Sequence, residues 1–207
     1  MMIPAGDVSL EGVLELPEHA NTVVIFAHGA GSDRKSPRNQ YAAKLLHEAG
    51  IGTLLFDLLT PAEKEQYQAN VFDIGRLTER LAAATEWLRS QPGMDAMKIG
   101  YLGASTGAAA ALGAAARLDG EISAVVSRGG RPDLADQDRL KDISAPTLFI
   151  IGADDTEVLE ASKAPFERLT CEKDWKLVPG ATHVFEEPGT LEQAAAEALG
   201  WFLEHLR

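Results

Sequence analysis

The chain has 207 residues, of which 45% are hydrophobic and 24% charged, and this composition is typical of a globular protein rather than a disordered one. Its 19 basic and 31 acidic residues give a formal charge of −12 at pH 7. That charge argues against nucleic acid and anionic membrane surfaces as partners, because both are bound through basic patches. The length suits one domain over residues 1–207 with a sizeable core.

The cysteine content and the N-terminal residues indicate the cellular compartment in which the protein is expected. Cys171 is the only cysteine, so no intrachain disulfide can form, and a reducing cytoplasm is the natural expectation. The first twelve residues lack a basic segment followed by a long apolar one, which a secretory signal requires. No run of about 18 apolar residues occurs, so no membrane-spanning helix is expected.

The predicted elements alternate along the chain. Residues 8–17 alternate apolar and polar positions and predict a hairpin or an edge strand that bends at Gly12. Predicted strands then follow at 22–29, 51–59, 97–103, 122–130, 146–153 and 174–181, and predicted helices at 39–50, 70–90, 105–118, 157–169 and 189–207. The stretches 60–69 and 129–143 are predicted to be polar connections. Continuous apolar strands that alternate with helices predict an α/β fold, with a mostly parallel, twisted sheet and helices on both of its faces.

One short motif lies where the strand at 97–103 meets a helix. Gly103-Ala104-Ser105-Thr106-Gly107 has the G-x-S-x-G spacing of a nucleophile elbow, in which a tight turn lifts the serine out of the sheet. The glycines are needed because a side chain would collide with the adjoining strand and helix. The alternative is a serine that caps the helix beside packing glycines.

A serine nucleophile needs a base, and the base needs an orienting acid, in the chain order Ser, Asp or Glu, His. Asp154 and Asp155 follow the strand at 146–153, and His183 lies in a loop after the last strand. We predict Asp155 as the acid, with Asp154 as the alternative. Asp57 also ends a strand, but it precedes the serine and breaks the order. Ser105, Asp155 and His183 are therefore the predicted catalytic triad.

The tetrahedral intermediate of acyl transfer needs hydrogen-bond donors for its oxyanion. One predicted donor is the backbone amide of Thr106, the residue after the nucleophile. The other is the amide of Ala30, in the glycine-rich loop that follows the strand at 22–29, where His28 and Gly29 are expected to shape the turn. An ordinary glycine-rich turn is the alternative.

These motifs together resemble the α/β-hydrolase superfamily, and within it the dienelactone-hydrolase-like branch, over nearly the whole chain. The resemblance implies an esterase-type hydrolase with a Ser-His-Asp triad and no cofactor. No His/Asp/Glu cluster with metal-ligand spacing is found either. Dienelactone hydrolases carry a cysteine nucleophile, whereas this elbow carries Ser105 and Cys171 lies elsewhere. The departure favours carboxylic esters in general over dienelactone.

Two further features concern the pocket. The interval between the strands at 122–130 and 146–153 has room for one short helix, so a site with little or no cap is expected, suited to small or accessible esters. Arg128 directly follows a strand and is a candidate for binding a carboxylate or phosphate on the substrate. The alternative for Arg128 is a structural ion pair with an acidic residue. The basic loop 32–40 beside the predicted oxyanion turn could act similarly or be a solvated loop.

The sequence thus predicts a hydrolase of small-molecule esters. A thioesterase or an acyltransferase would use the same triad, and a non-catalytic binding protein on the same fold is the alternative from another class. Trp201 and Phe202 near the end of the last helix are predicted to pack on the core, with a dimer contact as the alternative. A monomer or a homodimer is expected.

Overall fold

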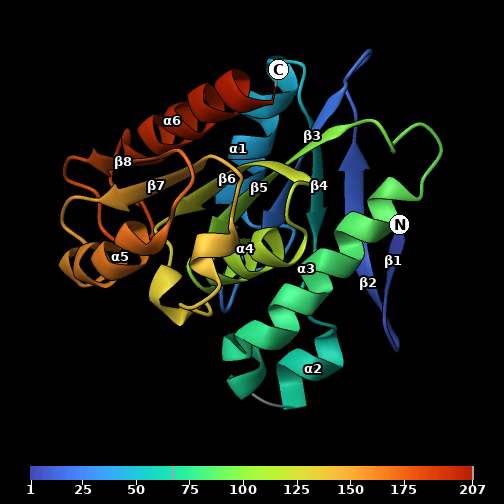
Figure 1. The fold of residues 1–207 in the computed structure, drawn as a ribbon, viewed down its shortest axis with the longest axis horizontal. Coiled ribbons are helices and arrows are strands. Elements are labelled where there is room, and N and C mark those ends of the chain that lie inside the picture. Colours follow the sequence, from blue (N-terminus) through green and yellow to red (C-terminus); the bar gives the residue numbers. More distant parts are fainter. Residues whose placement is uncertain (67, 207) are drawn as a thin grey trace.

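A computed structural model describes residues 1–66 and 68–206 of the chain. Within these residues, eight strands form one sheet in the order β1-β2-β4-β3-β5-β6-β7-β8 (Figure 1). The strands are β1 (Met2–Ala5), β2 (Val8–Glu15), β3 (Thr22–Ala27), β4 (Gly52–Phe56), β5 (Lys98–Ala104), β6 (Ile122–Arg128), β7 (Thr147–Gly152) and β8 (Lys173–Val178). β2 pairs antiparallel with both of its neighbours, β1 and β4. The other six strands, β3 to β8, pair in parallel with one another. The predicted α/β class is confirmed.

Helices cover both faces of the sheet. One face carries α1 (Pro37–Glu48) and α6 (Thr190–His205), while the other carries α3 (Ile74–Arg89), α4 (Thr106–Arg117) and α5 (Thr156–Arg168) (Figure 1). Every residue of β3, β4 and β7 is buried, because both of their faces lie under helices. No helix among the described residues is long and apolar enough to cross a membrane.

The predicted packing of the last helix is confirmed. Phe202 on α6 is fully buried against β5, where a Cβ at Gly100 would meet the Phe202 ring at 2.8 Å. Trp201 is half-buried, and its indole Nε1 donates to the carbonyl of Pro146 at 3.3 Å. These side chains hold α6 against the sheet.

The N-terminal strands differ from expectation. The strand predicted at residues 8–17 forms as β2, but it does not fold back on itself at Gly12, and it is not an edge strand because it lies between β1 and β4. Its hairpin partner is β1, and the antiparallel register places Ile3 opposite Leu10. Gly12 leaves room for this neighbour, since a Cβ there would meet Ile3 Cδ1 at 2.7 Å.

The stretch 60–69 is not the plain connection that its polarity suggested. It forms α2 (Pro61–Gln66), and a 3-10 helix covers Gln68–Phe72. A capping box starts α2: the Glu63 amide donates to Thr60 Oγ1 at 3.2 Å and the Thr60 amide donates to Glu63 Oε2 at 2.8 Å. Helix α3 begins at Ile74 rather than residue 70, because Asp73 caps it by accepting from the Arg76 amide.

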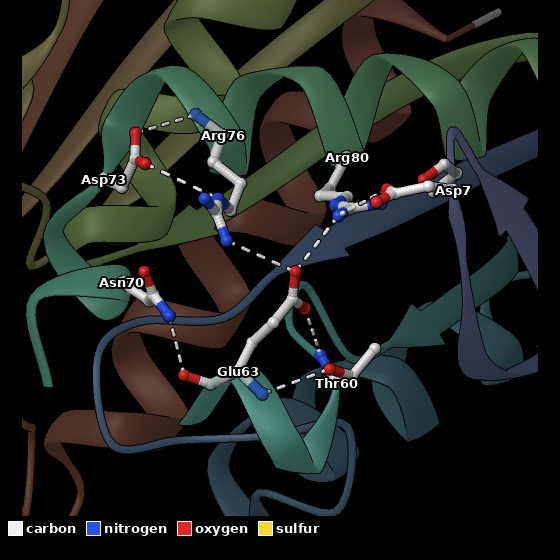
Figure 2. Close-up of polar contacts among 8 residues, drawn as sticks. Asp7, Thr60, Glu63, Asn70, Asp73, Arg76 and Arg80 are labelled. Atoms are coloured by element: carbon white, nitrogen blue, oxygen red, sulfur yellow. Dashed lines mark hydrogen bonds and ion pairs between the residues drawn. The ribbon is translucent and has the colours of Figure 1, made fainter. Parts of the chain in front are cut away.

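Glu63 also joins α2 to α3 (Figure 2). Its Oε1 accepts from Arg80 Nη2 at 3.1 Å and from Arg76 Nη1 at 3.4 Å, and Asn70 donates to its carbonyl at 2.8 Å. Burial favours a higher pKa for Glu63, but the hydrogen bonds from Thr60 and the charges of the two arginines outweigh it and lower the pKa. This network therefore holds α2 and the 3-10 helix Gln68–Phe72 against α3 through an ionised carboxylate.

We expect Glu63→Gln to lower the free energy of unfolding by about 1 to 3 kcal/mol at neutral pH, because both arginines lose a charged acceptor. A lowered folded-state pKa means that the carboxylate stabilises the fold above its ordinary value of 4.5. This contribution is lost as the pH falls through the folded-state pKa, so the difference between variant and wild type should shrink there. Urea unfolding at pH 7 and below pH 4 measures it. Glu79→Gln, on an exposed position of α3, is the control, and equal effects of both variants would contradict the prediction.

The second polar break is short, as expected. Residues 129–143 contain two 3-10 helices, Pro132–Leu134 and Leu140–Asp142, in place of the one predicted short helix. Leu140 is buried and packs this segment onto the body of the protein. The structure describes every residue between β6 and β7, and no cap domain is inserted there.

Candidate active site

The predicted elbow has the strained backbone geometry that is typical of a nucleophile elbow. Ser105 joins β5 to α4 with φ 51° and ψ −125°, a backbone conformation that L residues rarely adopt. A Cβ at Gly103 would lie 2.5 Å from the Cα of Ala108, and one at Gly107 would lie 2.6 Å from the carbonyl oxygen of His28. The glycines therefore allow the strand and the helix to meet at this turn. Ser105 is half-buried, and its side chain makes no capping hydrogen bond to α4, contrary to the helix-cap alternative.

We expect Gly107→Ala to lower the free energy of unfolding by about 2 to 4 kcal/mol, because the new methyl group would overlap the backbone of β3. Gly200→Ala is the matched control on α6, where the added methyl group would have nothing within 4 Å. That control should raise stability by up to about 1 kcal/mol through helix propensity. Thermal and urea unfolding of both variants check the prediction, and unchanged stability of Gly107→Ala would contradict it.

The acid and the histidine are in contact. Asp155 Oδ2 accepts from His183 Nδ1 at 2.8 Å, and the Asp155 side chain is 9% exposed against 41% for His183. Asp155 also begins α5, because its Oδ1 accepts from the Val158 amide at 3.3 Å. Asp154 is exposed. The structure therefore places Asp155, and not Asp154, against the predicted base.

Ser105 and His183 line one small cavity of about 130 Å³ at the carboxyl ends of the parallel strands. Among the described residues, no hydrogen bond joins their side chains. Catalytic hydrogen bonds are often long without substrate and tighten when it binds. The histidine nitrogen that does not contact Asp155 is Nε2, so this nitrogen is the one available to Ser105.

The loop after β3 approaches the elbow closely. A Cβ at Gly29 would lie 2.8 Å from the Ser105 Cβ, so only glycine fits there without displacement. His28 Nε2 accepts from the Leu58 amide at 3.0 Å, and Nδ1 lies 3.0 Å from the Gly29 carbonyl, to which it donates as the neutral tautomer. Burial lowers the pKa of His28 and so favours this neutral form. His28 shapes the turn, as expected.

The same loop is anchored at its far end. The Arg34 amide donates to Asp57 Oδ1 at 2.9 Å, and the Arg34 guanidinium pairs with Asp57 and Glu11. Asp57 therefore has a structural partner, consistent with its exclusion from the triad. The loop 32–40 is not simply solvated, since Ser36 and Asn39 are buried and Arg38 lines the small cavity.

The two predicted oxyanion donors lie side by side. Thr106 is the first residue of α4, so its amide has no partner within the helix. The Ala30 amide donates to Thr106 Oγ1 at 2.9 Å. Ala30 is therefore engaged by a hydroxyl group in this structure, which the sequence alone did not indicate.

A larger cavity of about 550 Å³ adjoins the small one, and the two share Gly29, Ala30 and Ser32. Four apolar side chains line it, and motif-based reasoning missed all of them: Leu59, Val71, Phe72 and Leu77. The only available signal was their apolar character, which does not distinguish a cavity wall from a core. Val71 and Phe72 belong to the segment held by Glu63, so part of the wall comes from the stretch before α3 rather than from a cap after β6.

Arg128 lies in the small cavity with Ser105 and is 5% exposed. Its Nη2 donates to Asn39 Oδ1 at 2.8 Å. Within residues 1–66 and 68–206 it forms no ion pair with a carboxylate, so the alternative of a structural ion pair is wrong.

Possible metal ligands gather elsewhere. Among the described residues, one trio, Glu172, Glu204 and His205, places its ligand atoms within 4.8 Å of one another. The trio lies where β8 begins and α6 ends, whereas His183 follows the carboxyl end of β8. Both carboxylates are exposed, and the trio has no contact with the triad.

The sheet order, the strained serine after β5, the acid after β7 and the histidine after β8 define an α/β-hydrolase fold. The chain belongs to the dienelactone hydrolase family, whose family model it matches over residues 10–206. The resemblance inferred from the motifs is thereby confirmed.

Individual relatives agree with this assignment. The crystal structure of a dienelactone hydrolase from Anabaena variabilis is 47% identical, superposes with a TM-score of 0.97, and is matched over 100% of this chain and 97% of that one. Est1E from Butyrivibrio proteoclasticus has a TM-score of 0.83 at 18% identity over 99% of this chain and 98% of that one, and shares the fold. A Mycobacterium tuberculosis protein provisionally named a phosphoribosyl transferase is 52% identical over 206 residues. That match covers 100% of this chain but 46% of the relative, so the chain spans about half the length of the mycobacterial protein.

Proposed function

We propose that this protein is a serine hydrolase that cleaves carboxylic esters. The observation that carries the proposal is the 2.8 Å hydrogen bond between Asp155 and His183, because the same His183 lines one cavity with the strained Ser105. A histidine oriented by a buried carboxylate is the arrangement that activates a serine hydroxyl.

In the proposed mechanism, Ser105 Oγ attacks the ester carbonyl while His183 Nε2 takes the hydroxyl proton. Asp155 remains ionised and stabilises the imidazolium cation through Nδ1. The tetrahedral intermediate collapses, the C–O bond to the alcohol breaks, and His183 returns the proton to the departing alkoxide. Water then attacks the acyl-enzyme with His183 as base, which releases the acid and restores Ser105.

The amides of Thr106 and Ala30 are the proposed donors to the oxyanion. The Thr106 amide lies at the amino end of α4, where the helix dipole also favours negative charge. In this structure the Ala30 amide donates to Thr106 Oγ1. In the proposed mechanism, the Ala30 amide exchanges this hydroxyl acceptor for the substrate oxyanion once the substrate is bound. The threonine hydroxyl holds the loop in place before that happens.

The cavities support esters of modest size. The larger cavity, with its apolar side chains, suits one side of the ester, and the small cavity, which Arg128 also lines, suits the other. The short segment after β6 leaves the site accessible. The transferase name of the mycobacterial relative does not guide the proposal, because this chain matches only 46% of that protein. The residues in the cavity, a serine and a histidine oriented by a carboxylate, are instead those that acyl transfer uses.

The test is covalent labelling of Ser105 by a fluorophosphonate probe, together with hydrolysis of 4-nitrophenyl esters of increasing acyl length. Labelling at Ser105 and hydrolysis of the shorter esters are the expected results. Labelling without ester hydrolysis would direct the proposal to thioesters or to an acyl acceptor other than water. Absence of labelling would overturn it and favour a binding protein on the hydrolase fold.

A further inference from the structure

Among residues 1–66 and 68–206, no carboxylate pairs with the buried guanidinium of Arg128. Arg128 is 5% exposed, and its Nη1 is buried with no hydrogen-bond partner among the described residues. The hydrogen bond from Nη2 to Asn39 orients the group but leaves its charge uncompensated. Burial and the nearby charge of Arg38 lower the pKa of Arg128 to about 10, so it remains protonated at neutral pH.

Such a group costs stability, because a charge removed from water needs a partner of opposite sign. Arg128 has only part of its hydrogen-bonding capacity satisfied, since a guanidinium carries five N–H donors. The partner that this group lacks within the described chain is an anion.

The surroundings of Arg128 are also positive. Helix α1 has 12 residues, no acidic residue in its first turn, and an N-cap residue, Ser36, whose side chain makes no capping bond. Its amino end lines the small cavity through Ser36, Arg38 and Asn39. The nearest carboxylate on Arg38 is Glu186 at 3.9 Å, in a pair whose side chains are 39% and 73% exposed. Exposed pairs of this kind are weak, so Arg38 keeps most of its attraction for another anion.

We propose that Arg128, Arg38 and the amino end of α1 form a subsite for an anionic oxygen group of the substrate, a carboxylate or a phosphate, beside the scissile carbonyl. The subsite and Ser105 line the same cavity of about 130 Å³, which holds a group of a few atoms. Guanidinium groups and helix amino ends both bind carboxylate and phosphate oxygens. The inference rests on the proposed function for its position next to the reacting carbonyl.

The first test measures anion binding without catalysis. Isothermal titration of wild type with inorganic phosphate and with succinate should show binding of at least one ion, and Arg128→Met should weaken it about tenfold or more. Arg38→Ala should weaken it by a smaller factor, and it also serves if Arg128→Met does not fold. Lys35→Ala, the same loss of charge on an exposed residue of the same loop, should leave binding unchanged. The ion that binds shows whether the anionic group of the substrate is a phosphate or a carboxylate. Equal binding by wild type and both arginine variants, or no binding at all, would overturn the proposal.

The second test measures selectivity. Half-esters of four- to six-carbon dicarboxylic acids with 4-nitrophenol carry a carboxylate, and the same compounds capped with a methyl ester are neutral. If the bound ion is a carboxylate, wild type should prefer the charged series, and Arg128→Met should lower the ratio of kcat/KM between the series about tenfold or more. If phosphate binds instead, phosphate should inhibit hydrolysis of the neutral series competitively, and Arg128→Met should abolish the inhibition. A ratio or inhibition unaffected by Arg128→Met would overturn the proposal.

Stability separates this role from a structural one. Removing an uncompensated buried charge should leave the Tm of Arg128→Met equal to or above that of wild type. A marked loss of Tm with unchanged anion binding would show that Arg128 supports the fold instead. Absence of fluorophosphonate labelling with intact anion binding would defeat the proposed hydrolase function and leave the anion subsite standing.

Discussion

Ester hydrolysis by Ser105→Ala is expected to fall about 10⁴- to 10⁶-fold in kcat, because the variant lacks the oxygen that attacks the ester carbonyl in the proposed mechanism. The fold should survive, since the alanine methyl group occupies the place of the serine Cβ and Ser105 makes no side-chain cap to α4. Steady-state kinetics on a 4-nitrophenyl ester, with active-site titration to exclude traces of wild type, measure the effect.

Two comparisons sharpen this result. Ser144→Ala changes the same atoms on an exposed residue far along the chain and should leave kcat unchanged. Ser105→Gly should be as inactive as Ser105→Ala but at least as stable, because glycine adopts a φ of 51° without the strain that a side chain adds. Retention of more than about a tenth of the activity in Ser105→Ala would contradict the role of this residue.

The second large effect is expected for Asp155→Asn, with a fall of about 10³- to 10⁴-fold in kcat. An amide in place of the carboxylate no longer stabilises the His183 cation and can force the wrong imidazole tautomer. Asparagine keeps an oxygen for the Val158 amide, so the start of α5 and the overall stability should change little.

Asp154→Asn is the matched control, because it makes the same substitution one residue earlier on an exposed side chain. Its kcat should stay within about twofold of wild type, in keeping with the small effects of surface substitutions. The two variants compared by kcat and by Tm decide between the two carboxylates. Equal losses from both, or a larger loss from Asp154→Asn, would refute the assignment of Asp155.

Local patterns explain what could be predicted. The strands, the helices and the glycine-flanked turn at Ser105 depend on residues a few positions apart, and apolar periodicity and turn chemistry express such short-range preferences directly. Even the missed helix α2 has a local signal, because Thr60 and Glu63 have the spacing of a capping box. Its polarity obscured it, since a helix that makes few apolar contacts resembles a connection.

Other features depended on contacts between distant positions. The place of β2 inside the sheet follows from pairing with β1 on one side and β4 on the other, and both pairings satisfy the same alternating pattern. The apolar cavity wall likewise combines Leu59, which follows β4, with the 3-10 helix Gln68–Phe72 and with Leu77 of α3. Apolar character alone does not separate such a wall from a core.

The sequence by itself determined the α/β class, the chain order of serine, carboxylate and histidine, and the need for glycine around the elbow, because these follow from periodicity, chain order and the geometry of one turn. Only the tertiary structure decided between the two carboxylates, since the contact of Asp155 with His183 joins residues 28 positions apart. It also decided the environment of Arg128, whose side chain makes one hydrogen bond in the described part of the chain, to Asn39 at a separation of 89 positions. Whether a charge has a counter-charge depends on which side chains packing brings around it, and no local pattern records that.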